Sequence, residues 1–447
     1  MKALLKRMKW VECGLMVCLT ILLLGVPVSS NAKDGPPIKI GILGPMKYTL
    51  GEHMWVSAVM AAEEINASGG VNVNGVNRKI ELVKKDGNSA VSLVDALNAF
   101  KSLITFDKVD FVVGGHRSES VLAMMDTMAK YKMVFINTGA GHSKIMERVG
   151  EDYDKYKYMF RTQSNTRRVT LYVALNSANA AADALRKNLG IEKPKVAIII
   201  EKTLAGNGMT MAGKAVLPKM GMEVIGEWRP SAKATDMTAE LTAVRASGAQ
   251  IIYNFFPGPA GTALSRGWGE LQIPAVLAGM NGQAQRKMHW ENTGGMCNYE
   301  VTVGPIGRCK ITERTIPYFD GFAKRLGDFP LYNAPATYDG IFVLKEAIER
   351  AGTIESDVVV SAMEKTDYRG AIGRIVFYQK GHKTPHDYIM GPGYVTWVGS
   401  QWQDGKFIPV SPNGKIALGD KRWEGFRYAG TVDYKLPQWV IKHWKKK

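Results

Sequence analysis

The chain has 447 residues, of which 46% are hydrophobic, and it carries a formal net charge of +17 at pH 7. This length allows two or three domains with ample hydrophobic cores. Because the sequence contains no solenoid-length repeat and no low-complexity tract, repeat arrays and disordered proteins are excluded. The positive charge favours anionic ligands, but lysine and arginine residues are scattered rather than massed in one stripe, so we expect no nucleic-acid partner.

Residues 1–32 have the organisation of a cleaved secretory signal peptide. Basic residues come first, an apolar run covers residues 13–28, and Ser30, Asn31 and Ala32 form a small-x-small cleavage pattern. The apolar run is short for a membrane span, and no later run is comparably long. We therefore predict a soluble periplasmic protein that begins near Lys33, with an uncleaved N-terminal anchor as the alternative.

Short apolar runs alternate with amphipathic stretches in the first third of the mature chain. Apolar or alternating runs predict strands at residues 38–43, 79–84, 111–113 and 133–136, and spacings of three and four predict helices over 56–65, 93–104 and 121–128. A strand and helix series of this kind implies an α/β fold with a parallel sheet and right-handed crossovers.

Two glycine-rich turns follow neighbouring strands of this series. The first, GGHRS at 114–118, leads into a helix that Ser118 is placed to cap, and the second is NTGAGHS at 137–143. Glycine lets a ligand approach the backbone, and free amides with a serine hydroxyl suit a carboxylate. Because ligands bind outside the carboxyl ends of parallel strands, the two turns together form a candidate site. The alternative is a pair of tight turns without a ligand.

The alternation starts again after a long alanine-rich helix at 166–189, which indicates a second domain. Strands are predicted at 195–200, 222–228, 250–255 and 275–278, with helices near 208–220, 236–247 and 261–271, and further helices at 312–326, 335–351 and 355–365. From residue 375 the composition turns to Gly, Pro, Trp and Tyr. The chain ends in a basic segment, residues 436–447, which we expect to be a solvated tail.

Cysteine and histidine residues suggest one covalent link and no metal site. Only Cys297 and Cys309 remain after removal of residues 1–32, and export favours a disulfide between them. His382 and His386 are four residues apart, but Pro385 between them argues against a helical metal pair. We expect these histidines to be exposed in a loop.

The order and spacing of seven segments resemble the type I periplasmic solute-binding proteins of ABC transporters, most closely the leucine/isoleucine/valine-binding group. No single segment carries the resemblance, which extends over nearly the whole mature chain to Phe377. The segments are IKIGILGP (38–45), AAEEINASGGV (61–71), VDFVVGGHRSES (109–120), FINTGAG (135–141), FRT (160–162), VAIIIEKTLAGNG (196–208) and ATYDGIFVLKEAIERAG (336–352).

The resemblance implies two Rossmann-like lobes with parallel sheets, joined by three crossovers near residues 160–164, 303–307 and 375–378. The first lobe would comprise residues 37–162 and 305–375, and the second lobe residues 163–304 and 376–435. It further implies a monomer that closes over a ligand between the lobes and delivers it to an inner-membrane ABC permease. Neither an enzymatic activity nor a cofactor is expected.

On the first lobe, the resemblance places the ligand contacts at the two glycine-rich turns. The serine that binds the ligand carboxylate in this family falls on Ser118, and the backbone and threonine contacts fall on Gly139, Ala140 and Gly141. Gly141 replaces the threonine. Tyr48, in the loop after the first strand, completes the predicted set, and the cationic candidates nearby are His116, Arg117, Arg167 and Arg168.

On the second lobe, this chain departs from the family pattern. Ala205 and the pair Phe256 and Pro257 stand where the family has pocket tyrosines, and Asn281 stands where an acidic residue pairs with the ammonium of an amino acid. A buried ammonium without a charged partner loses about 3 to 5 kcal/mol, or roughly a thousandfold in affinity.

The predicted ligand is therefore a small carboxylate, either an organic acid or an atypical amino acid. An ordinary branched-chain amino acid is the alternative, since Glu52, Glu119, Glu201 or Glu270 could supply the missing carboxylate.

Two enzymatic interpretations fit the sequence less well. An exported hydrolase could use Ser118 as nucleophile with His116 or His142 as base, but Ser120 occupies the final glycine position of a GxSxG elbow. Residues 208–214 fit GxxxxGK, yet Ala215 stands where a nucleotide site needs the Ser or Thr that binds magnesium.

Overall fold

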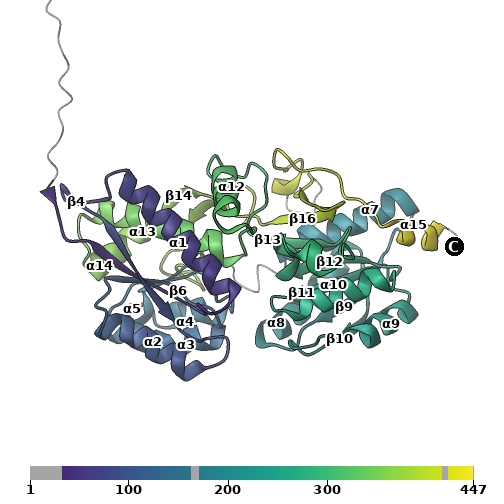
Figure 1. Cartoon of the computed structure of the whole chain (residues 1–447), viewed down its shortest axis with the longest axis horizontal. Coiled ribbons are helices and arrows are strands. Elements are labelled where there is room, and N and C mark those ends of the chain that lie inside the picture. The colour runs from purple at the N-terminus through teal and green to yellow at the C-terminus, as the bar shows by residue number, and fades with distance from the viewer. Residues whose placement is uncertain (1–32, 163–170, 415–420, 446–447) are drawn as a thin grey trace, which may run out of the picture.

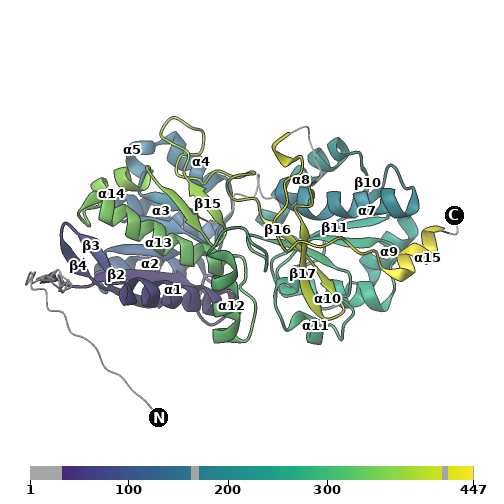
Figure 2. The ribbon, with the colours of Figure 1, turned by 90° about the horizontal axis from the view of Figure 1, so that it is seen from above.

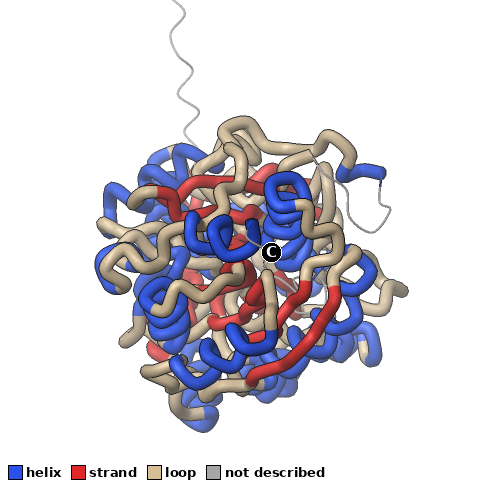
Figure 3. Tube along the Cα trace, turned by 90° about the vertical axis from the view of Figure 1, so that its right-hand side faces the viewer, coloured by secondary structure: helices blue, strands red, loops and turns tan. Residues whose placement is uncertain are grey.

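Two α/β lobes lie side by side in the computed structural model, which describes residues 33–162, 171–414 and 421–445 (Figure 1). Viewed along the long axis, most strands lie towards the middle, with helices and loops around them (Figure 3). The predicted two-lobed fold is confirmed.

The first lobe is built on five parallel strands in the order β5-β2-β6-β7-β8. Every residue of β6 and β7 is buried, as expected for strands that helices cover on both faces. The predicted alternation of strands and helices is confirmed here. The strands are β2 (Ile38–Gly44), β5 (Ile80–Asp86), β6 (Phe111–Gly114), β7 (Phe135–Asn137) and β8 (Met159–Arg161).

Helices from two distant parts of the chain cover this sheet. Five follow its strands, namely α1 (Thr49–Ala67), α2 (Leu93–Thr105), α3 (Ser118–Lys130), α4 (Lys144–Glu151) and α5 (Tyr153–Tyr156). Three come from later in the chain, namely α12 (Thr315–Leu326), α13 (Asn333–Ala351) and α14 (Ser356–Met363). Helix α13 packs along α1 (Figure 2). Two small sheets flank them, β1-β4-β3 and β14-β15, with β1 (Lys33–Asp34), β3 (Val71–Val73), β4 (Val76–Arg78), β14 (Asp367–Gly370) and β15 (Gly373–Val376).

The second lobe has a seven-stranded mixed sheet in the order β10-β9-β11-β12-β13-β16-β17. Its first five strands are parallel, whereas β16 and β17 are antiparallel additions at one edge. The sequence did not predict these two strands. The members are β9 (Lys195–Ile200), β10 (Glu223–Trp228), β11 (Ile251–Phe256), β12 (Val276–Asn281), β13 (Val301–Gly304), β16 (Val398–Gln403) and β17 (Lys406–Ser411).

The helices of the second lobe pack around this sheet. Of the long helix predicted at 166–189, the first residues lie outside the described ranges, and the described part contains a π-helical segment, η1 (Ala174–Asn179), before α7 (Ala180–Leu189). The others are α8 (Leu204–Val216), α9 (Thr238–Ser247), α10 (Ala260–Glu270), α11 (His289–Asn292) and α15 (Gln438–Lys445), with 3-10 turns η2 (Leu217–Met220), η3 (Gln283–Gln285) and η4 (Lys421–Trp423).

The chain passes between the two sheets three times, after β8, after β13 and between β15 and β16. On the third passage, residues 377–388 fold back against β8 before the chain reaches the second lobe. His386 is therefore fully buried, with its ring stacked on Phe160 at 4.0 Å and its Nε2 lying 3.0 Å from Glu364 Oε1. The prediction that this histidine is exposed is wrong.

Cys297 and Cys309 are free thiols, so the predicted disulfide between them is wrong. Cys297 packs with Ala284 and Trp402, whereas Cys309 packs in a separate cluster with Val398 and Tyr428. Burial raises the pKa of each thiol to about 12. Their packing explains both residues without a covalent link.

The basic C-terminal segment is not a solvated tail in its described part. Trp439 Nε1 donates to the Ile273 carbonyl at 2.9 Å, and Trp444 Nε1 donates to the Pro274 carbonyl at 2.6 Å, which fixes α15 on the second lobe. Over the described ranges, no helix is both long and apolar enough to cross a membrane. The predicted signal peptide, residues 1–32, lies outside those ranges.

Candidate functional site

Ser118 joins the two glycine-rich turns of the first lobe. Its Oγ accepts a hydrogen bond from the backbone N–H of His142 at 3.2 Å, so the turn after β6 is tied to the turn after β7. Ser118 is the first residue of α3 and Arg117 holds the cap position, so the predicted capping role is wrong. Because the hydroxyl oxygen acts as acceptor, its own proton remains to donate to a ligand.

The path of the first turn requires glycine. Gly114 and Gly115 have φ values of +131° and +83°, which other residues rarely adopt. A Cβ on Gly114 would lie 2.1 Å from the Leu43 carbonyl oxygen. The glycines therefore bring the backbone close to β2 and place Ser118 beside the second turn.

The second turn is organised by the buried side chain of Asn137. Its Oδ1 accepts from the N–H groups of Gly139 at 3.3 Å and Ala140 at 2.9 Å, and its Nδ2 donates to the Ala140 carbonyl at 2.7 Å. Two of the predicted backbone contacts are thus occupied within the turn. No described residue accepts a hydrogen bond from the half-buried Gly141 N–H, which leaves this amide beside Ser118 for a ligand.

Arg161 stabilises the second turn through a hydrogen bond to its backbone. Its guanidinium is fully buried, donates to both Asp387 carboxylate oxygens at 2.9 and 2.6 Å, and donates to the His142 carbonyl at 3.1 Å. Asp387 neutralises this charge, so Arg161 positions His142 and does not serve as a counter-ion for a ligand. Arg161 belongs to the FRT segment, in which sequence analysis predicted no residue of the binding site.

The other cationic candidates near the turns differ in charge and exposure. Burial lowers the pKa of His116 to about 4, so its imidazole is neutral at pH 7. Arg117 is exposed and lies 3.6 Å from the Glu119 carboxylate. Arg167 and Arg168 lie outside the described residues. The described part of the candidate anion site therefore consists mainly of neutral hydrogen-bond donors at the start of α3.

Tyr48 stands at the N-terminus of α1 and is 46% exposed. Helix α1 follows β2, and α3 follows β6, the neighbouring strand of the sheet. Because the strands are parallel, both helices begin at the same edge, and Tyr48 lies on the same edge as Ser118.

On the second lobe, two of the three predicted ligand contacts are occupied inside the lobe. Phe256 is fully buried in the cluster that contains Leu264 and Trp268. The fully buried Asn281 Nδ2 donates to the Gly261 carbonyl and Ser265 Oγ, both at 3.0 Å, and to Glu300 Oε1 at 2.8 Å. Both side chains have structural roles here. Ala205, the second residue of α8, is half-buried at the strand-end edge of the sheet.

Glu201 is the buried acid that the sequence did not single out. It directly follows β9, is 2% exposed, and its Oε2 has no hydrogen-bond partner among the described residues. Burial raises its pKa to about 7, although a backbone hydrogen bond from Gly258 opposes this rise. It lies near Tyr332 of the first lobe, whose pKa is raised first by burial and then by the charge of Glu201.

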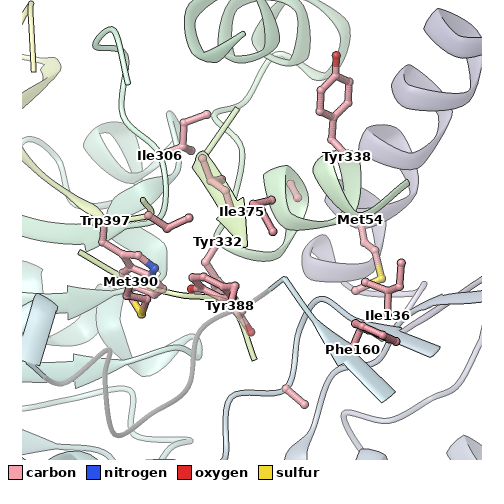
Figure 4. Close-up of a cluster of buried hydrophobic side chains, with 14 of the residues drawn as sticks. Met54, Ile136, Phe160, Ile306, Tyr332, Tyr338, Ile375, Tyr388, Met390 and Trp397 are labelled. Carbon is pink, nitrogen blue, oxygen red and sulfur yellow. The ribbon is translucent and has the colours of Figure 1, made fainter. Parts of the chain in front are cut away.

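Tyr332 precedes α13 and belongs to the buried cluster that also contains Tyr388, Met390 and Trp397 (Figure 4). Glu201 of the second lobe and Tyr332 of the first lobe therefore mark a place where the lobes face each other.

A second contact between the lobes, which we call the interlobe clasp, joins Arg286 and Asp328. Asp328 follows α12 and accepts from Arg286 Nε at 2.9 Å and from the Lys287 N–H at 2.6 Å. His53 of α1 lies 3.7 Å from the same carboxylate. Burial lowers the pKa of His53 to about 4, so this ring is neutral at pH 7. Arg286 therefore supplies the positive charge of the clasp.

A groove of about 800 Å³ lies elsewhere on the first lobe, lined by α1, α12 and α13. Two ion pairs lie along it, Arg325 with Glu63 at 2.6 Å and Arg314 with Glu64 at 3.1 Å. Because ligands of parallel α/β sheets bind at the carboxyl ends of the strands, the strand-end edges remain the better candidate.

Comparisons with known proteins agree with this arrangement. The family model described as periplasmic binding protein matches residues 37–392. An amino acid binding protein of Pseudomonas aeruginosa is 29% identical over 219 residues, which is 48% of this chain and 53% of that protein, so the match spans about half of the relative.

Two solved structures share the fold over most of their length. A solute-binding protein of an ABC transporter from Rhodopseudomonas palustris, in complex with 3,4-dihydroxybenzoic acid, has a TM-score of 0.68 at 18% identity and covers 89% of this chain and 98% of its own. The branched-chain amino acid binding protein LivJ from Streptococcus pneumoniae, in complex with isoleucine, has a TM-score of 0.66 at 18% identity and covers 83% and 97%.

Proposed function

We infer, because this chain belongs to the periplasmic binding protein family of the branched-chain amino acid group, that it captures a small carboxylate between its lobes. It is the substrate-binding component of an ABC transporter. The proposal concerns the chemical class of its ligand. The observation that carries it is the hydrogen bond from the His142 N–H to Ser118 Oγ at the start of α3, which leaves the Ser118 hydroxyl proton and the neighbouring Gly141 N–H as donors to a ligand. These donors suit a carboxylate, which the helix N-terminus also favours.

The second lobe closes the site and, in this proposal, signals occupancy to the permease. The edge of the first lobe that carries Ser118 and the edge of the second that carries Ala205 are both strand-end edges of parallel strands. A ligand that contacts both edges stabilises the closed arrangement, to which the interlobe clasp also contributes. Export to the periplasm and delivery to an inner-membrane permease complete the proposed role.

A hydrolase with Ser118 as nucleophile is the second candidate. It would need a histidine ring within hydrogen-bond reach of the hydroxyl. The hydrogen bond to Ser118 comes instead from the backbone of His142, and the ring Nδ1 of that residue accepts from the Lys144 N–H at 3.1 Å. This geometry favours a receptor over an enzyme.

The test is to measure ligand binding by the protein expressed from Lys33, with thermal shift and calorimetry as the two readouts. The panel consists of branched and aromatic carboxylates with and without an α-amine. A ligand at about a thousand times its dissociation constant stabilises the protein by roughly 4 kcal/mol, which moves the unfolding midpoint by several degrees. We expect Ser118→Ala to weaken binding about ten- to a hundredfold, because it removes a hydrogen bond to a charged group.

Ser143→Ala is the matched control. Ser143 is the last residue of the second turn, and its side chain makes no capping hydrogen bond to α4. This variant should bind like the wild type. The proposal fails if no carboxylate shifts the midpoint, or if Ser118→Ala and Ser143→Ala bind equally well.

A further inference from the structure

Glu201 is a buried acid with no cation paired to it among the described residues. Its neighbour Arg229 directs its guanidinium elsewhere: Nε donates to the Ile200 carbonyl at 3.0 Å, and Nη2 donates to the Glu201 backbone carbonyl at 3.2 Å and to Asn207 Oδ1 at 2.8 Å. Nη1 lies 3.5 Å from the Glu227 carboxylate. The Glu201 side chain receives only the Gly258 backbone N–H among the described residues.

An unpaired buried carboxylate is costly, so its retention calls for a partner that is not part of the lobe. Glu201 comes immediately after β9, and the carboxyl ends of parallel strands form the edge where ligands bind. An added Cβ on Gly258, in the loop after β11, would lie 3.4 Å from Glu201 Oε2, so the carboxylate lies among the strand-end loops of the second lobe. Tyr332 of the first lobe is close enough for the charge of Glu201 to raise its pKa.

The other three acids that could replace the missing carboxylate are less suitable. Glu52 and Glu270 are exposed, and Glu119 is half-buried with its charge shared by Arg117 at 3.6 Å. Solvent screens the exposed charges, and a paired charge gains less from a second cation. Within the part of the chain that the structure describes, Glu201 alone of the four is both buried and without an ion-pair partner.

We propose that Glu201 binds the ammonium group of an amino acid whose carboxylate is held at Ser118, an inference that rests on the proposed function. The acid has moved from the end of β12, where Asn281 stands, to the end of β9. The ligand class is thereby narrowed from small carboxylates to those with an amine. A carboxylate ligand without an amine would leave Glu201 without a cationic partner.

The test compares matched ligand pairs, namely leucine with 4-methylpentanoate and phenylalanine with 3-phenylpropanoate, by calorimetry. The wild type should bind the amine-bearing member of a pair at least about tenfold more tightly. Glu201→Gln keeps the shape of the side chain but removes its charge, and should weaken binding of the amine-bearing member about a hundredfold. Binding of the deaminated acid should change little. Glu270→Gln, an exposed neutralisation on the same lobe, should leave both affinities unchanged.

Any of the following results would overturn the inference. A wild type that prefers deaminated acids contradicts it, and so does a Glu201→Gln variant in which the ratio of the two affinities is unchanged. If Ser118→Ala weakens both members of a pair while Glu201→Gln leaves their ratio intact, the carboxylate site stands and only the role of Glu201 fails. If the wild type binds neither member, the proposed function fails as well. The unfolding midpoint of Glu201→Gln establishes that the variant is folded.

Discussion

Two regions of the second lobe bury a glutamate, and they treat it in opposite ways. In the interior, Glu300 is fully buried, accepts from Asn281 Nδ2 at 2.8 Å and lies 3.2 Å from His289 Nε2. At the strand-end edge, Glu201 is almost equally buried but has one backbone donor and an unpartnered oxygen. Burial therefore does not distinguish a structural acid from a binding acid in this protein. The number of partners does.

The comparison of Glu300 with Glu201 also explains the structural role of Asn281. Its Oδ1 accepts from the Gln283 N–H at 3.1 Å, so its two amide atoms are engaged inside the lobe. A position that aligns with an ammonium-binding acid in the family serves here to hold Glu300. Another residue must then supply the negative charge that pairs with the ligand ammonium, and Glu201 is placed to do so.

The largest effect should come from breaking the partnered network. Glu300→Ala leaves His289 and Asn281 without their common acceptor in a site that water does not reach, and we expect the free energy of unfolding to fall by about 3 to 5 kcal/mol. Urea unfolding followed by circular dichroism measures the loss. Glu291→Ala, a change at an exposed position nearby, is the control and should cost less than about 0.5 kcal/mol. A loss below 1 kcal/mol for Glu300→Ala would mean that the network is not structural.

Replacement of the unpartnered Glu201 should have the opposite effect and increase the free energy of unfolding at pH 8. Burial raises the Glu201 pKa from an ordinary value of 4.5 to about 7, so the folded protein holds this proton more tightly than the unfolded chain does. Stability is therefore unaffected below about pH 4.5, falls as the pH rises from 4.5 to 7, and is lower by about 3 kcal/mol above pH 7. Glu201→Gln removes this component, so the variant should be more stable than the wild type at pH 8 and similar to it at pH 4.5.

Urea midpoints measured from pH 4.5 to pH 8 provide the check. Asp339, whose pKa burial raises to about 7, contributes a fall of the same sign that persists in the variant. The variant should therefore show a shallower fall rather than a flat profile. If Glu201→Gln is less stable than the wild type at pH 8, the carboxylate has a stabilising partner and the contrast with Glu300 disappears.

Sequence reasoning predicted most of the fold because the central strands are continuous apolar runs. FVV at 111–113 and IIYNFF at 251–256 lie in strands that are buried along their whole length, and burial on both faces requires such composition. It missed β16 because VGSQWQ is polar. Gln401 is nevertheless buried, since its Nε2 donates to the carbonyls of Tyr299 at 2.9 Å and Lys435 at 2.8 Å. These partners are distant in sequence, so no local pattern reveals them.

The site was predictable only in part, for the same reason. Glycine-rich turns after strands identified the Ser118 region, because the backbone path itself requires glycine there. The roles of Arg161 and Glu201 depend on Asp387 and Tyr332, which lie more than a hundred residues further along the chain. A terminal acid after the apolar run VAIII was a signal for Glu201, but it did not separate this residue from three other glutamates.

The smallest effect should come from the interlobe clasp, where a carboxylate of one lobe is partnered by the other. Arg286→Ala removes a partly exposed charge from Asp328 but leaves the Lys287 N–H in place, so we expect a loss of about 1 kcal/mol from the closed arrangement. Ligand affinity should then fall about fivefold, because binding has to supply the free energy of closure that the clasp no longer contributes. Calorimetry gives the affinity, and small-angle scattering of the ligand-free protein should show a larger radius of gyration. Arg308→Ala, which breaks an exposed pair with Asp320, is the control and should change neither quantity. Equal affinities and equal scattering for the two variants would show that Asp328, like Glu300, is partnered for stability alone.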